Sequence, residues 1–337
     1  MTSYHLRVAE VVPETGDARS FVLDVPPELA DVFAHEPGQF LTVRVPVSPP
    51  VARCYSLCNA PGDPLTITVK RTADGYGSTW LVSSVAAGDT LEVLPPAGRF
   101  TPRSLDGPFL LVAAGSGSTP VLGILRTVLA TGNGRITLFY ANRDDSSVIF
   151  AGELRRLVAK YPDRLTVVHW LESVSGLPTP ASLEPLLAPW ASGAEVFLCG
   201  PTAFMAAADE ALRRLDVARV HVERFQSLAD DPFSAPVAPP ATPGADGEPL
   251  EVEIDGATHT LAWPEGRRML DVLVDHGLAA PSSCREGRCG ACTCLLVEGD
   301  VQMVNNEVLD ATDLADGYVL ACQSLPRSGP FRVTYDA

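Results

Sequence analysis

Four cysteines near the C-terminus have a spacing that suits an iron–sulfur cluster. Cys284, Cys289 and Cys292 follow the pattern C-x4-C-x2-C, and Cys322 stands further along the chain. This is the ligand spacing of plant-type [2Fe-2S] clusters. The intervening segment 285–291 is small or polar and contains two glycines, which lets a loop wrap tightly enough for its N–H groups to reach the sulfurs. The spacing therefore predicts an electron-transfer site.

A structural zinc site and a different cluster ligand are the alternatives. Zinc sites made of cysteines usually have two short C-x2-C pairs, whereas this segment has one, so the cluster is favoured. Cys294 lies two residues after Cys292 and would point to the same side of an extended segment, so it could replace Cys292 as a ligand. We favour Cys292 and interpret Cys294 as a small buried thiol.

A second group of chemically useful side chains is Arg53, Tyr55 and Ser56. An aromatic ring can cover a flavin ring, a hydroxyl can bond flavin N5, and an arginine can neutralise a phosphate. Alone, this group is equally typical of a half-buried strand. Further along, Gly77-Ser78-Thr79 stands at the expected start of a helix over 80–85, where free N–H groups and a hydroxyl suit a pyrophosphate. Together the two segments indicate a flavin site.

Two glycine-rich turns indicate a pyridine-nucleotide site. The first, Gly115-Ser116-Gly117-Ser118-Thr119-Pro120, follows a buried strand and opens a helix, where N–H groups and the helix dipole hold a pyrophosphate. Pro120 stands where the dinucleotide fingerprint has its third glycine, and no Gly-Lys-Ser/Thr sequence supports a P-loop for ATP. The second turn, Cys199-Gly200-Pro201, also ends a strand and faces the same crevice, because ligands collect at the carboxyl ends of parallel strands.

The segment after the second strand of this region bears on the choice of nucleotide. A residue that reads a 2′-phosphate is expected there, and Arg143 occupies the position. Asp144 and Asp145 stand beside it and would repel a phosphate. NADH is therefore favoured over NADPH.

Hydrophobic patterning divides the chain into three domains and a linker. Residues 1–104 contain short alternating stretches separated by proline and glycine, which predicts an antiparallel β-barrel. Residues 105–227 alternate between apolar strands, glycine-rich turns and helices, which predicts a parallel α/β domain. Residues 228–248 are rich in proline and alanine and are interpreted as a linker. Residues 249–337 begin with a hairpin around Asp255-Gly256, followed by a helix, the cysteine loop and a closing strand, an α+β arrangement.

Composition limits the classes of partner. The 337 residues carry a formal net charge of −16 and are 46% hydrophobic. The apolar share supports packed cores, and the negative charge argues against nucleic acid as a partner while leaving open a basic protein. Cluster assembly needs reduced thiolates, which indicates a cytoplasmic location. No apolar run reaches membrane length and no secretory signal is visible, so neither membrane insertion nor export is expected.

In order along the chain, these motifs resemble those of the reductases of two-component oxygenases. In that family a ferredoxin-NADP reductase-like module of barrel and nucleotide domain is fused to a C-terminal plant-type ferredoxin of β-grasp fold. The resemblance covers nearly the whole chain. Reductases that serve 3-ketosteroid 9α-hydroxylases are the most similar members, on segments 74–81, 94–100, 140–144 and 317–323. The resemblance implies FAD and a [2Fe-2S] cluster as cofactors, NADH as electron donor and a Rieske-type terminal oxygenase as partner.

The resemblance also assigns residues to each cofactor. Those it gives to the flavin are Arg53, Tyr55, Ser56, Val69, Lys70, Arg71, Gly77, Ser78 and Thr79. Those it gives to the nucleotide are Gly115, Gly117, Thr119, Pro120, Cys199, Gly200 and Pro201. Glu223 and Phe225 fall where the family's nucleotide domain ends against the flavin, although a core strand explains them equally well. Ser56 and Cys199 are then the predicted catalytic residues, beside the flavin and the nicotinamide, and neither is assigned a nucleophilic role.

The resemblance implies that electrons pass singly from NADH through FAD and the cluster to an oxygenase. Ala114 and Ser118 depart from the family, which commonly has glycine and an aliphatic residue there, but the N–H donors of the turn remain. A reductase of a di-iron phenylacetyl-CoA epoxidase has the same domain order and is one alternative. A non-catalytic flavin redox sensor or electron carrier is another. None of the six histidines has metal-like or triad-like spacing, so hydrolysis has no support.

Overall fold

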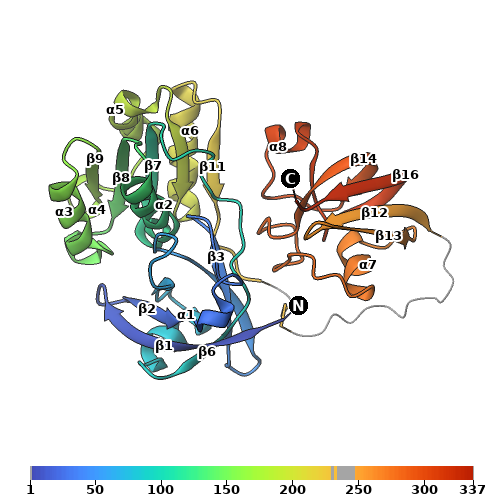
Figure 1. Ribbon diagram of the computed structural model, residues 1–337. Helices are drawn as coiled ribbons and strands as arrows, with labels where there is room; N and C mark the ends of the chain where they lie inside the picture. The colour runs from blue at the N-terminus through green and yellow to red at the C-terminus, as the bar shows by residue number, and fades with distance from the viewer. Residues whose placement is uncertain (1, 229–230, 234–246, 337) are drawn as a thin grey trace. The chain divides into compact units, whose positions relative to one another are not determined.

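The computed structural model describes residues 2–228, 231–233 and 247–336, which group into two compact units (Figure 1). The first is formed by Tyr4–Pro96 and Phe100–Ser227, and the second chiefly by residues within Leu228–Ala337. Most of the predicted linker, 228–248, lies outside the described residues, and the predicted domain boundaries stay predictions. No helix in the described ranges is both long and apolar enough to span a membrane.

The N-terminal half of the first unit is a six-stranded antiparallel sheet in the order β4-β3-β6-β1-β2-β5. An isolated antiparallel bridge between Leu57 and Ile67 joins its two ends, so the sheet is nearly closed into the predicted barrel. Inward-facing side chains such as Leu6, Phe21 and Val43 are fully buried in its core, because alternate residues of a strand face the same side. The elements are β1 (Tyr4–Pro13), β2 (Ala18–Asp24), η1 (Pro27–Leu29), β3 (Phe40–Val45), β4 (Val51–Ser56), β5 (Thr66–Lys70), α1 (Tyr76–Ser84) and β6 (Thr90–Val93).

The helix predicted over 80–85 begins earlier, at Tyr76. Gly75 precedes it in an extended conformation and provides no side-chain cap, so the sequence lacks the polar N-cap residue that usually marks a helix start. Gly77, Ser78 and Thr79 consequently lie in the first turn of α1 rather than before it.

The second half of this unit is a parallel five-stranded sheet in the order β11-β10-β7-β8-β9, with helices on both faces (Figure 1). Every residue of β7 and β8 is buried, as expected for central strands that are covered on both sides. This confirms the predicted α/β fold. Its elements are β7 (Phe109–Ala114), η2 (Gly115–Gly117), α2 (Ser118–Thr131), β8 (Ile136–Asn142), η3 (Asp145–Ser147), α3 (Ala151–Lys160), β9 (Leu165–Leu171), α4 (Glu172–Ser175), α5 (Pro180–Ala191), β10 (Glu195–Cys199), α6 (Thr202–Arg214) and β11 (Val220–Glu223).

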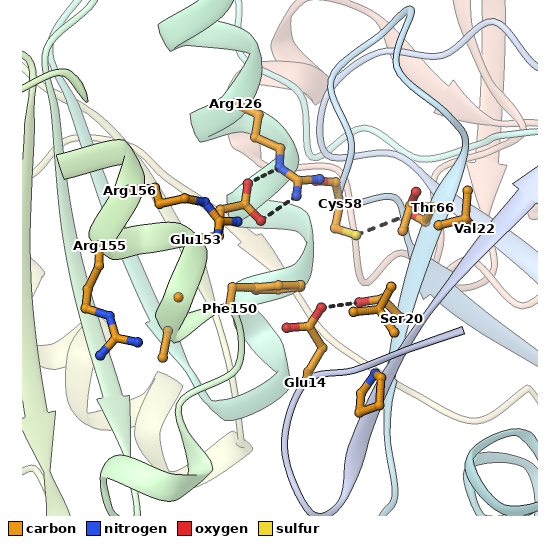
Figure 2. A pocket seen from close by; sticks show the side chains of 14 residues that line it. Glu14, Ser20, Val22, Cys58, Thr66, Arg126, Phe150, Glu153, Arg155 and Arg156 are labelled. Atoms are coloured by element: carbon orange, nitrogen blue, oxygen red, sulfur yellow. Dashed lines mark hydrogen bonds and ion pairs between the residues drawn. The ribbon is translucent and has the colours of Figure 1, made fainter. Parts of the chain in front are cut away.

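Helix α2 joins the two halves of the first unit. A Cβ atom on Gly123 would lie 2.8 Å from the carbonyl oxygen of Leu57, so the helix backbone lies directly against the barrel. Arg126 donates to the carbonyl oxygen of Cys58 at 2.6 Å and forms a bidentate pair with Glu153 of α3 (Figure 2). Because a guanidinium fork matches a carboxylate and still reaches a carbonyl, this one side chain connects barrel, α2 and α3.

The second unit is a mixed five-stranded sheet in the order β13-β12-β16-β14-β15, in which only the β12–β16 pair is parallel. The predicted hairpin is confirmed: Asp255 and Gly256 both have positive φ, as a two-residue type I′ turn requires. Helix α7 buries Met269 and Leu273 together with Trp263 and sheet residues. The elements are β12 (Glu248–Ile254), β13 (Ala257–Trp263), α7 (Met269–Asp275), β14 (Thr293–Met303), α8 (Ala311–Ala315), β15 (Tyr318–Leu320) and β16 (Ser324–Thr334), which confirms the predicted α+β ferredoxin domain.

Candidate functional site

The residues predicted to bind a flavin come together at the end of β4 and the start of α1. A Cβ atom on Gly77 would lie 3.1 Å from Arg53 Cγ and 3.7 Å from Tyr55 Oη. The absence of a side chain at this glycine therefore lets the helix N-terminus approach both residues of the strand. Ser56, the next residue of β4, is buried. Burial also raises the pKa of the Tyr55 hydroxyl, which keeps it neutral and able to donate.

In the first turn of α1, backbone N–H groups are more available to a ligand than side-chain hydroxyls are. Ser78 Oγ is engaged by Thr72, whose N–H lies 3.1 Å away, and by the Gly75 carbonyl at 3.2 Å. The hydroxyl of Ser78 thus stabilises the turn. The side chain of Thr79, by contrast, is exposed. A helix of nine residues leaves its first N–H groups without partners inside the helix, and these are suited to a pyrophosphate.

The three predicted residues of β5 and its end differ in their surroundings. Val69 is buried in the barrel core, so only its backbone can face a ligand. Arg71 is exposed. Lys70 lies beside the nucleotide turn, since a Cβ atom on Gly115 would be 3.7 Å from its Nζ. Burial lowers the pKa of Lys70, while Asp17 raises it.

The first glycine-rich turn is held by side chains from the sheet. Gly115 has a φ of +53°, and Tyr140 Oη lies 3.0 Å from its carbonyl oxygen and 2.9 Å from Ser118 Oγ. Thr119 Oγ1 donates to the Ser116 carbonyl at 3.0 Å, and Pro120 is buried within α2. The hydroxyls of this turn therefore hold its shape, and its N–H groups are left to face a ligand.

The two turns are in contact with each other. A Cβ atom on Gly117 would lie 2.2 Å from the carbonyl oxygen of Cys199, and one on Gly200 would lie 3.1 Å from the Cβ of Ala114. Pro201 follows in an extended conformation and precedes α6. The structure thus brings the two predicted nucleotide turns together at the carboxyl ends of the neighbouring strands β7 and β10. This is where a doubly wound sheet binds nucleotides.

Glu223 ends the edge strand beside Cys199, its partner in the parallel register. Desolvation raises the pKa of Glu223 to about 8, so the carboxyl is largely protonated at neutral pH. Burial, with a smaller contribution from Glu223, raises the pKa of the Cys199 thiol well above its usual value, which rules out a thiolate. Phe225 lies beyond the strand and is 45% exposed, so a core role does not explain it.

The four predicted cluster cysteines form two pairs. The thiol of Cys289 donates to Cys284, and that of Cys292 donates to Cys322. No group of three or more histidine, cysteine, aspartate or glutamate side chains in the described ranges converges as one metal ion would require. Two pairs of thiols suit two irons better than a single zinc. Cys294 is buried outside the pairs, and burial raises its pKa to about 12.

Backbone N–H groups surround the sulfurs. Glu286 and Arg288 donate to Cys284 Sγ at 3.3 and 3.4 Å, and Ala291 donates to Cys289 Sγ at 3.5 Å. The bond from the Cys289 thiol, and then the N–H groups of Arg288 and Glu286, lower the pKa of Cys284. In each pair one thiol, Cys284 or Cys322, has a lowered pKa, while its partner, Cys289 or Cys292, has a raised pKa. The N–H donors around the sulfurs fit a [2Fe-2S] cluster.

A positive φ at two positions keeps this loop tight. Gly287 has a φ of +78° and Gly290 a φ of +70°. A Cβ atom on Gly287 would lie 2.6 Å from the Asn305 carbonyl oxygen, so only glycine fits this position.

Two residues of the crevice were not found from the sequence. Tyr140 is a buried strand residue whose hydroxyl contacts the nucleotide turn, and Asn142 is a buried amide at the end of the same strand. The side-chain N and O of Asn142 have no hydrogen-bond partner among the described residues, which marks a place for a polar ligand. A polar residue in an otherwise apolar strand was the available signal.

Two cavities of the first unit lie away from this crevice. One of about 550 Å³ lies beside Arg126, Glu153 and Phe150 (Figure 2), and one of about 620 Å³ lies beside Arg103 and His221. No predicted cofactor residue lines either cavity. We place the functional site by the converging turns, because dinucleotides bind across strand ends as well as in enclosed cavities.

Comparison with known proteins identifies two domains. Residues 111–210 match the family described as "Oxidoreductase NAD-binding domain", and residues 252–327 match "2Fe-2S iron-sulfur cluster binding domain". The chain is 27% identical to phthalate dioxygenase reductase of known structure, with a TM-score of 0.59 over 98% of this chain and 97% of that one. That structure is described as modular, for electron transfer from pyridine nucleotides to [2Fe-2S].

Full-length relatives give higher identities. The chain is 52% identical to the "3-ketosteroid-9-alpha-monooxygenase, ferredoxin reductase component" of Rhodococcus rhodochrous, over 98% of this chain and 96% of that protein. Identity to the protein of the same description in Mycolicibacterium smegmatis is 54%, with the same coverage. One of the subunits of the 1,2-phenylacetyl-CoA epoxidase of Escherichia coli is 34% identical over 100% of this chain and 99% of that protein.

Proposed function

Because this chain belongs to the family of ferredoxin reductase components of 3-ketosteroid-9-alpha-monooxygenases, we propose that it passes electrons from NADH through FAD and a [2Fe-2S] cluster to a Rieske-type steroid hydroxylase. The observation that carries the proposal is the presence, on one chain, of an NAD-binding domain and a cluster domain. A nicotinamide gives two electrons at once and such a cluster accepts one. A flavin between them would supply the conversion from paired to single electrons.

The flavin-binding residues that we propose are Arg53, Tyr55 and Ser56 with the first turn of α1. Tyr55 has a neutral hydroxyl and a ring that can lie against an isoalloxazine. Arg53 supplies positive charge next to the N–H groups of Gly77 and Ser78, where a pyrophosphate would be held. The close approach of Gly77 to both side chains fits such a group.

The nucleotide residues that we propose lie on the two contacting turns. The N–H groups of Gly115 to Ser118 and the N-terminus of α2, a helix of 14 residues, would bind the pyrophosphate. Gly200 and Cys199 would border the nicotinamide. Cys199 contributes shape and exclusion of water rather than a nucleophile, since its thiol stays protonated. Glu223 beside it holds a proton at neutral pH and can donate a hydrogen bond into the crevice.

The cluster ligands that we propose are Cys284 and Cys289 for one iron and Cys292 and Cys322 for the other. Their N–H···S bonds would stabilise the thiolates and bear on the reduction potential. The chain carries a charge of −16, so a basic surface is expected on the oxygenase that receives the electrons.

Reconstitution with a partner tests the function. Purified chain, NADH and the oxygenase component of a 3-ketosteroid 9α-hydroxylase should together hydroxylate a 3-ketosteroid, whereas either protein alone should not. The matched comparison replaces the oxygenase with a phenylacetyl-CoA epoxidase. Steroid turnover by this chain alone, or support of the epoxidase only, would contradict the proposal.

A further inference from the structure

Three charged side chains of the first unit lie close together, and one of them lies beside the first nucleotide turn. Asp17 lies in the turn between β1 and β2, Lys70 ends β5, and Arg143 directly follows β8. Arg143 Nη2 donates to Asp17 Oδ2 at 3.1 Å. The ion pair therefore joins a turn of the barrel to the nucleotide domain. The two residues are 126 positions apart, so no local sequence pattern indicates their contact.

Asp17 is held in place from the barrel side. Its Oδ1 accepts a hydrogen bond from Thr15 Oγ1 at 2.8 Å, and its carbonyl accepts one from the Arg71 N–H at 2.7 Å. The side chain of Asp17 is 22% exposed, whereas that of Arg143 is 63% exposed. The carboxylate is thus a fixed group, and it holds the more exposed guanidinium.

The position of this ion pair bears on the choice between NADH and NADPH, because the 2′-group of a bound nucleotide is expected there. The residue after the second strand of a doubly wound sheet faces the adenosine ribose, and it reads either a 2′-hydroxyl or a 2′-phosphate. Lys70 Nζ lies near Gly115 of the first turn, and Asp17 and Arg143 are both close enough to Lys70 to affect its pKa, so the pair lies beside the same crevice. An arginine at this position would ordinarily bind a 2′-phosphate.

Asp144, the acidic residue next to Arg143, is hydrogen-bonded within its own turn. Asp144 caps the following short helix: its Oδ1 accepts from Ser147 N at 2.9 Å and from Ser146 Oγ at 2.8 Å. These bonds lower the pKa of Asp144 and turn its carboxylate toward its own turn. The partner of Arg143 is Asp17, which comes from the barrel.

We propose that Asp17 is a specificity-determining residue that selects NADH by occupying Arg143. With the ion pair formed, a 2′-phosphate would have to displace a fixed carboxylate and would then be repelled by it, while a 2′-hydroxyl meets no such barrier. The proposal rests on the proposed function, because it concerns the nucleotide of that same site. It adds that the choice of nucleotide is made partly by the barrel rather than by the nucleotide domain alone.

The test uses the full-length holoprotein with Asp17→Asn and a matched control, Asp24→Asn. Asp24 lies on the same hairpin and pairs with Arg7 at 2.6 Å, so the control removes the same charge and also breaks an aspartate–arginine pair. The ligands are 2′,5′-ADP, which is the adenosine half of NADPH, and 5′-AMP, which is the adenosine half of NADH. Their dissociation constants are measured by calorimetry at low salt, where surface charges are least screened. Asp17→Asn should improve binding of 2′,5′-ADP relative to 5′-AMP by about tenfold.

A double variant decides whether Arg143 carries the effect. Asp17→Asn combined with Arg143→Gln should lose the gain, and Asp24→Asn should leave the ratio within about twofold of wild type. A gain that survives in the double variant, or a ratio for Asp17→Asn no different from that of Asp24→Asn, would overturn the proposal. Reduction of the wild-type flavin by NADH is followed separately. If NADH did not reduce the flavin, the proposed function would be contradicted. The ratio of 2′,5′-ADP to 5′-AMP binding would still decide the role of Asp17.

Discussion

The cysteine loop and the nucleotide crevice are built in opposite ways. Three of the four cluster cysteines lie within one short loop, and the fourth follows the next strand pair. The crevice instead combines the ends of β5, β7, β8, β10 and β11 with the turn after β1. A site on one loop depends on spacing and backbone conformation, whereas a site assembled from many strands depends on the whole fold. The two regions should therefore respond differently to substitution.

Removal of a cluster ligand should give the largest effect, confined to one function. Cys289→Ser should lose the cluster and reduce electron transfer to a one-electron protein acceptor by at least about 100-fold. Reduction of the flavin by NADH should persist, because the cysteine loop and the crevice lie in separate units. Iron content, electron paramagnetic resonance and anaerobic stopped-flow absorbance measure the two functions. Cys294→Ser is the control and should keep its iron, and equal loss in both variants would refute the ligand assignment.

Crowding the contact between the two nucleotide turns should give the next largest effect. In Gly117→Ala the new Cβ would lie 2.2 Å from the Cys199 carbonyl oxygen, so one turn must move. We expect kcat/KM for NADH to fall about 10- to 100-fold, as displacement of a positioning group by an ångström can cause, with the cluster unchanged. Gly152→Ala in α3 is the matched control, because its nearest neighbour would be 3.9 Å away. Normal NADH oxidation by Gly117→Ala would show that the turns do not form the site.

The ionisation of Glu223 should give the smallest effect, seen in stability. The pKa of this carboxyl is raised from 4.5 to about 8 in the folded chain, so the folded state retains a proton that the unfolded state has lost. The free energy of unfolding should therefore fall as pH rises from about 4.5 to about 8. Glu223→Gln removes the pH-dependent contribution of this carboxyl to the free energy of unfolding. Its Tm relative to wild type should rise by about 10 °C between pH 5 and pH 9.

Differential scanning calorimetry of the holoprotein measures this difference. Glu10→Gln, on an exposed part of β1, serves as the control and should show no such change. A constant difference between Glu223→Gln and wild type across this pH range would mean that the carboxyl is not desolvated in solution.

The same contrast separates what the sequence predicts from what it does not. The spacing of Cys284 to Cys292 and the glycines between them describe a local loop, so the cluster site could be predicted with its geometry. The glycine turns at 115–120 and 199–201 and the fold class of each region could be predicted because strand and helix periods are local. The contact of Gly117 with Cys199 and the pairing of Arg143 with Asp17 could not, because both join segments that only the folded chain brings together.

Hydroxyl groups show a second limit of reasoning from sequence. Ser78 and Thr119 were predicted as ligand-binding residues, and the structure shows both hydroxyls bonded within their own turns. A serine or threonine at a helix start can serve the backbone or a ligand, and residue type alone does not distinguish these uses. Tyr140 is the opposite case, since a residue in a buried strand supports the turn from outside it.

Anaerobic titration of the purified holoprotein with NADH tests the central claim most directly, with flavin absorbance and the electron paramagnetic resonance signal of the cluster recorded on the same samples. The account predicts that flavin absorbance bleaches and that a reduced [2Fe-2S] signal appears as NADH is added, with electrons shared between the two centres. Flavin bleaching without any cluster signal, in protein shown by iron and sulfide analysis to contain the cluster, would contradict it.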